Sequence, residues 1–112
     1  MTRSGIQYPD IIDLTTEAKD GTVRLILTET EALTGTDVPA LKLKLDNYLA
    51  YARSGQLPAR TPSPPARPVL IRVDLYAPPD QLIVMFLRHY RLLLEKTGLG
   101  LEVSLNQQDL AL

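Results

Sequence analysis

Apolar and polar residues alternate along four short segments of this chain, which is the pattern of strands that bury one face of a sheet. The clearest segment is 69–76, where every second residue is aliphatic, and we expect it to be a central strand. Between the first two segments, Lys19-Asp20-Gly21 supplies a turn, which predicts an N-terminal hairpin. The predicted strands are 11–14, 22–28, 69–76 and 101–106.

Two longer segments repeat their apolar residues every three or four positions, as amphipathic helices do. The first follows the cap signal Thr34-Gly35-Thr36-Asp37 and runs to about Ser54. The second runs from Pro78-Pro79-Asp80 to about Thr97, with Gly98 as its C-cap. The predicted buried stripes are Val38, Leu41, Leu45, Tyr48, Leu49 and Ala52 on the first helix, with Lys44 outside the stripe, and Leu82, Ile83, Phe86, Tyr90, Leu93 and Leu94 on the second.

The element order β-β-α-β-α-β predicts an α+β two-layer sandwich. Right-handed crossovers that advance in one direction place both helices on the same face of a four-stranded mixed sheet. The other face of the sheet then has no helix to cover it. We expect a single domain over 1–112 with a folded core over 8–105, a proline-rich loop at 56–68 and a short tail at 107–112.

The composition of the 112 residues is that of an ordinary globular domain and excludes several kinds of chemistry. Lys and Arg number 12 against 13 Asp and Glu, so no overall field favours nucleic acid or an anionic membrane. The chain has no cysteine and one histidine, and we predict no metal site, no cofactor and no catalytic residue. The longest apolar run, Leu82 to Leu87, is far shorter than the roughly 20 residues of a membrane span, which favours a cytoplasmic protein.

The uncovered sheet face is the first candidate site. Its alternating positions combine large apolar side chains with charges of both signs, which suits contact with another protein or with a second copy of the chain. The alternative is a solvated face whose charges pair across strands. We therefore predict a non-enzymatic interaction or self-associating module, with a homodimer as one form. The predicted partner-binding residues are Ile11, Ile26, Leu70, Arg72 and Tyr76.

A second hypothesis is a ligand-binding or enzymatic domain. Open α/β sheets bind ligands beyond the carboxyl ends of their strands, here where the third strand meets the second helix. The candidates there are Asp74, Tyr76, Asp80 and His89. The competing interpretation is structural: Asp80 lies where a helix start favours negative charge, and no sequence neighbour orients His89 as a base.

The proline-rich loop offers one short recognition pattern. Pro62-Ser63-Pro64-Pro65-Ala66-Arg67 fits the polyproline ligands of aromatic grooves, although a stiff linker requires the same composition. We expect a linker.

Three short motifs carry a family resemblance. Tyr8-Pro9-Asp10-Ile11-Ile12-Asp13, then Asp20-Gly21-Thr22-Val23, and then Leu45-Asp46-Asn47-Tyr48-Leu49-Ala50 with Ser54-Gly55 together resemble a family of small bacterial domains of unknown function. Tyr8 stands where that family usually has Asn. The resemblance implies a bacterial source and the ββαβαβ layout, and it assigns no chemistry to any residue.

Overall fold

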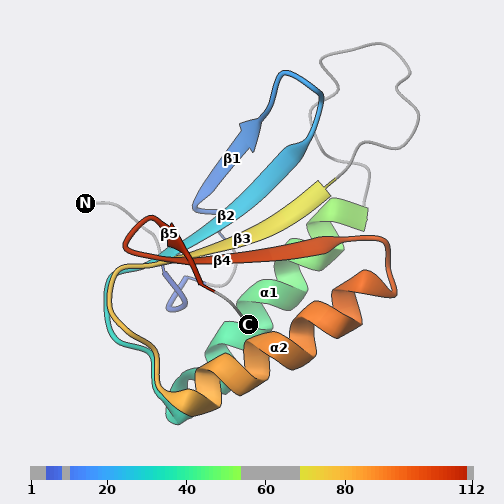
Figure 1. The fold of residues 1–112 in the computed structure, drawn as a ribbon. Coiled ribbons are helices and arrows are strands. Elements are labelled where there is room, and N and C mark those ends of the chain that lie inside the picture. The colour runs from blue at the N-terminus through green and yellow to red at the C-terminus, as the bar shows by residue number, and fades with distance from the viewer. Residues whose placement is uncertain (1–4, 9–10, 54–68, 111–112) are drawn as a thin grey trace.

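The computed structural model describes residues 5–8, 11–53 and 69–110, so the proline-rich loop and its recognition pattern lie outside the described residues. A single mixed sheet has the strand order β1-β2-β3-β4-β5, with parallel pairing on both sides of β3 and antiparallel pairing at both edges. The two helices lie on one face of this sheet (Figure 1). The elements are β1 (Leu14–Glu17), β2 (Val23–Glu29), the short 3₁₀ helix η1 (Gly35–Asp37), α1 (Val38–Arg53), β3 (Val69–Leu75), α2 (Gln81–Glu95), β4 (Gly100–Leu105) and β5 (Gln108–Asp109).

The α+β class, the mixed sheet and the central position of β3 are confirmed, but the prediction of four strands is wrong. The segment predicted as a tail turns back at Asn106 and Gln107 and pairs with β4 as a fifth strand. Both turn residues have positive φ, 50° and 67°, as a tight two-residue hairpin turn requires. Glycine is the usual residue at positive φ, and because this turn contains none, the sequence pattern did not predict it.

The first strand also begins later than predicted, at Leu14 instead of Ile11. Asp13 leaves the ladder because its N–H donates to the hydroxyl of Tyr48 on α1, 2.9 Å away. The predicted turn of the hairpin is confirmed, with Gly21 at φ 93° and the Asp20 carboxylate accepting the N–H of Thr22.

The crossover loops that follow β2 and β3 run side by side toward the two helix starts (Figure 1). Asp80 holds them together. Its side chain caps α2 by accepting the N–H of Ile83, and it also accepts the N–H of Gly35 from the other loop. The backbone N–H of Asp80 donates to Leu33 O. At the far end of α2, Gly98 takes φ 84° and Leu99 N–H donates to Leu94 O, as predicted for the C-cap.

The core lies between the sheet and the helices, and two predicted stripes need correction. On α2 the fully buried set includes Leu87, whereas Leu82 and Leu93 are exposed and Phe86 is half-buried. The predicted stripe was centred too far toward the side of the helix that faces α1. On α1, Lys44 is fully buried although it carries a charge. The buried core residues on the helices are Leu41, Leu45, Tyr48, Ile83, Leu87, Tyr90 and Leu94.

Candidate functional site

The uncovered sheet face is dominated by ion pairs. One row across it runs from Leu14 through Ile26 and Arg72 to Glu102. Arg72 Nε lies 2.7 Å from Asp74 Oδ1, and its Nη1 lies 3.6 Å from Glu102 Oε1. The hydrogen bond to Asp74 raises the pKa of the Arg72 guanidinium. This network neutralises the middle of the face.

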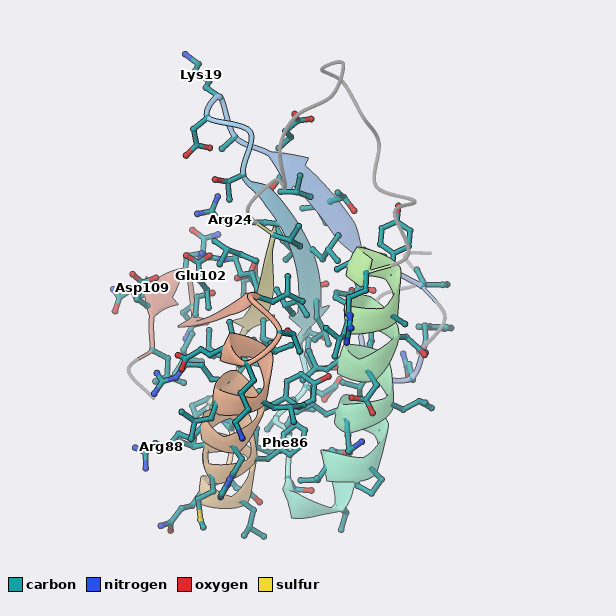
Figure 2. All side chains as sticks on the ribbon, turned by 90° about the vertical axis from the view of Figure 1, so that its right-hand side faces the viewer. Lys19, Arg24, Phe86, Arg88, Glu102 and Asp109 are labelled. Atoms are coloured by element: carbon teal, nitrogen blue, oxygen red, sulfur yellow. The ribbon has the colours of Figure 1, made fainter. Side chains whose placement is uncertain are left out.

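The network extends to both neighbouring strands. Arg24 on β2 places its Nε 2.9 Å from the same Glu102 oxygen, and Figure 2 shows Arg24, Glu102 and Asp109 on one side of the molecule. Ser104 donates its hydroxyl to Asp74 at 2.6 Å. Arg24, Arg72, Asp74 and Glu102 on this face are thus all paired within the chain.

The five predicted partner-binding residues are therefore unequally available. Ile26 is only 6% exposed, so it has little surface left for a partner. Ile11, Leu70 and Arg72 are half-buried, and Tyr76 is 41% exposed. Most of this face therefore fits the alternative prediction, a solvated face whose charges pair across strands. Tyr76, just after the end of β3, is its most exposed predicted residue.

The four residues of the predicted ligand pocket do not converge. Asp74 is engaged by Arg72 and Ser104 on the uncovered sheet face. Asp80 caps α2 and accepts a hydrogen bond from Gly35 in the neighbouring loop, which confirms that its role at the helix start is structural. His89 is exposed on α2. No hydrogen bond or ion pair among the described residues joins any two of these four as an acid and a base.

A cleft of about 340 Å³ does lie at the carboxyl end of the sheet, beside β2 and not β3. Two of its three carboxylates are occupied by the chain itself: Glu29 accepts the N–H groups of Ile6 and Glu31, and Asp37 accepts that of Thr34. The lining residues are Ile6, Gln7, Glu29, Glu31, Ala32, Leu33, Asp37 and Ala40. In the described part of the chain, no three His, Cys, Asp or Glu side chains gather as metal ligands.

Sequence reasoning missed the buried pair of Lys44 and Asp13. Lys44 Nζ lies 2.6 Å from Asp13 Oδ1 and 2.6 Å from Gly5 O, and the two side chains are 0% and 2% exposed. The spacing of Lys44 from Leu41 and Tyr48 is the signal that places it on the buried side of α1. The pair holds the N-terminal segment against α1 and leaves neither group open to a substrate.

Four apolar side chains define the outer face of α2: Leu82, Met85, Leu92 and Leu93. The sequence pattern predicts Leu82 and Leu93 to be core residues, but the structure exposes them. The four side chains are 57%, 46%, 53% and 49% exposed. On α1 the exposed large apolar side chain is Leu43, at 52%. Half-buried Phe86 points into the space between α1 and α2, whereas Arg88 projects away from both helices (Figure 2).

His89, which is exposed, lies midway along the outer face of α2, and exposed Arg88 lies about 100° around the helix axis from it, beside this face. Leu82 and Met85 precede them by one to two turns, and Leu92 and Leu93 follow by one turn. The outer face of α2 thus has two apolar ends and a polar centre.

Comparison with protein-family models, with curated proteins and with solved structures finds no match to this chain. The family resemblance drawn from the motifs stays a prediction. Among the helices of the described residues, none is long and apolar enough to cross a bilayer.

Proposed function

We propose that this chain is a non-enzymatic self-associating module and that the outer face of α2 binds the same face of a second copy. The observation that carries the proposal is the exposure of four large apolar side chains on one helix. Exposed apolar side chains that gather on one face mark association surfaces more often than isolated ones do. The neutralised sheet face and the engagement of Glu29 and Asp37 in the cleft by backbone N–H groups favour association over catalysis.

The apolar area suits a reversible dimer. Four half-exposed side chains amount to about two complete side-chain burials per copy, and each complete burial contributes about 1.5–3 kcal/mol. Two copies together then gain about 6–12 kcal/mol, against an association cost of about 4–15 kcal/mol. The balance predicts a dissociation constant of about micromolar or weaker.

A second copy is favoured as the occupant because the face is self-complementary. Closed two-fold dimers use one patch twice, so each half of the patch must fit the other half. The outer face of α2 has an apolar end on each side of its polar centre. A two-fold rotation therefore places Leu82 and Met85 near Leu92 and Leu93 of the partner subunit.

Leu92→Lys tests the surface, and Leu43→Lys is its matched control. Both replace a leucine of nearly equal exposure, 53% and 52%, on a helix of the same layer. Light scattering should show the wild type and Leu43→Lys as dimers at high concentration and Leu92→Lys as a monomer. Equal masses for all three proteins would reject the outer face of α2 as the interface.

The uncovered sheet face is the other surface that this experiment can reveal. If Leu92→Lys stays dimeric while Tyr76→Lys becomes monomeric, the interface lies on the sheet, as the sequence pattern predicts. Tyr76 is suited to this comparison because it is the most exposed of the five predicted residues.

A further inference from the structure

We infer that Met85 makes the proposed self-association sensitive to oxidants, because conversion of its thioether to a sulfoxide by a peroxide separates the two copies. The inference rests on the proposed function and adds a means of regulation to the same surface. It follows from the position of Met85 on α2 and from the oxidisable side chains that the rest of the chain lacks.

Met85 lies within the apolar surface of α2. Leu82 precedes it by three residues and Leu92 follows it by seven, and both spacings keep side chains on one side of a helix. Met85 is 46% exposed. It is therefore open to a dissolved oxidant in the free chain, and it is covered when the outer face of α2 binds a second copy.

Oxidation by a peroxide is selective for Met85 on this surface. Mild peroxide attacks thiols and thioethers. The chain has no cysteine, and its other methionine is Met1. Leucine side chains do not react with peroxide. The reaction therefore changes one of the four apolar residues of the outer face of α2 and leaves the other three as they are.

The reaction transfers one oxygen atom to the sulfur of Met85. A lone pair of the sulfur attacks the nearer oxygen of a hydroperoxide and forms the S–O bond. The O–O bond breaks, and the departing oxygen takes the proton and leaves as water or as an alcohol. The sulfur is oxidised and the peroxide is reduced, so the product is a polar sulfoxide in place of an apolar thioether.

The sulfoxide opposes association because its oxygen accepts hydrogen bonds. In the free chain, water satisfies this oxygen. In the dimer the oxygen is buried against leucine side chains, where an unpaired polar group is unfavourable enough to raise the dissociation constant at least about tenfold. Each copy contributes its own Met85 to a two-fold interface, so the penalty occurs twice.

The weakness of the dimer keeps Met85 accessible. With a dissociation constant of about micromolar or weaker, free chains are present at equilibrium, and the oxidant reacts with them. Oxidised chains leave the equilibrium, so the remaining dimers dissociate by mass action. Methionine sulfoxide reductases convert the sulfoxide back to the thioether, which makes the change reversible.

M85Q and L43Q isolate the effect of polarity at residue 85. Glutamine resembles methionine sulfoxide in size and polarity, so M85Q should raise the dissociation constant at least about tenfold without any peroxide. L43Q makes a comparable change at a residue of α1 that is 52% exposed, and it should dimerise as the wild type does. Equal dissociation constants for M85Q and the wild type would overturn the inference.

Light scattering before and after treatment with hydrogen peroxide tests the oxidation itself. Once mass spectrometry shows one added oxygen at Met85, the dissociation constant of the wild type should be at least about tenfold higher, and methionine sulfoxide reductase should restore it. M85L has no thioether at this position, so peroxide should leave its dissociation constant unchanged.

Three outcomes would contradict this account. Oxidised wild type that dimerises as tightly as the untreated protein would overturn the inference. A rise for M85L equal to that for the wild type would show that peroxide acts at another residue, and would overturn the role of Met85. A wild type that is monomeric before oxidation would overturn the proposed function itself, so the two failures are distinct.

Discussion

Lys44 Nζ and Asp13 Oδ1 lie 2.6 Å apart inside the protein, with less than 3% of either side chain exposed. Asp13 also accepts the N–H groups of Gly5 and Thr28, and Lys44 donates to Gly5 O. A buried charge pair with this many hydrogen bonds fixes one arrangement of the segments it joins. Here it fixes the N-terminal segment against β2 and α1.

Replacing Lys44 by Met should destabilise the protein by about 3–5 kcal/mol, because the carboxylate of Asp13 would remain buried without its cation. Lys42→Met is the matched control: Lys42 forms an equally short pair with Asp46 on the same helix, but its side chain is 58% exposed. The control should cost at most about 0.5 kcal/mol. Urea unfolding followed by circular dichroism measures both, and equal midpoints would contradict this account.

Tyr48 and Tyr90 should be the last of the five tyrosines to ionise. Burial raises the pKa of each phenol well above its usual value, and for Tyr90 the hydrogen bond to Asp46 adds to the shift. A raised pKa in the folded state stabilises the fold below pH about 10 and loses that contribution as the pH rises through the folded-state value.

The ultraviolet absorbance of tyrosinate, recorded during an alkaline titration, measures this order. Two of the five tyrosines should ionise together with unfolding, and Tyr48→Phe should leave one. Ionisation of all five before any loss of the circular dichroism signal would show that Tyr48 and Tyr90 are not sequestered.

Gln107→Gly should stabilise the protein by about 1 kcal/mol. Gln107 adopts φ 67°, where a side chain is strained and glycine is not. Gln108→Gly, one residue later in β5, is the control and should be neutral or destabilising. Thermal unfolding separates the two variants, and a lower midpoint for Gln107→Gly would argue against the tight turn.

Leu70→Ser and Tyr76→Ser should leave the solution mass of the protein unchanged. The charges beside Leu70 and Tyr76 are paired within the sheet, so a partner would have to separate Arg72 from Asp74 and Glu102. Light scattering on both variants checks this expectation. A monomer for either variant, with the fold intact by circular dichroism, would move the interface to the sheet.

The regular elements could be predicted from the sequence because their signals are local. The alternation in β3, the start of α2 at Pro78-Pro79-Asp80 and the positive-φ glycine Gly98 after its end are each encoded within a few residues, and the structure confirms them. The fifth strand was missed because its turn uses Asn106 and Gln107 where glycine is usual. The late start of β1 depends on Tyr48, 35 residues away from Asp13, and no local pattern reveals such a contact.

The candidate surface was harder to predict because helical period alone does not fix the buried side. The apolar residues of α2 cover more than half of its circumference, so the stripe could be centred on Leu82 and Leu93 or on Leu87. In the structure, Leu87 packs in the core against the sheet, whereas Leu82 and Leu93 are exposed to solvent. The pairing of Arg24 and Arg72 with Glu102 likewise depends on strand register, which joins residues from three separate strands.

The central claim, self-association through the outer face of α2, is tested most directly by light scattering of the wild type and Leu92→Lys over a concentration series at pH 8. The account predicts that the wild-type mass rises from that of the 12.4 kDa chain toward twice that value, while Leu92→Lys stays at the lower mass. A wild type that remains monomeric at every concentration, or a Leu92→Lys variant that dimerises as the wild type does, would contradict it.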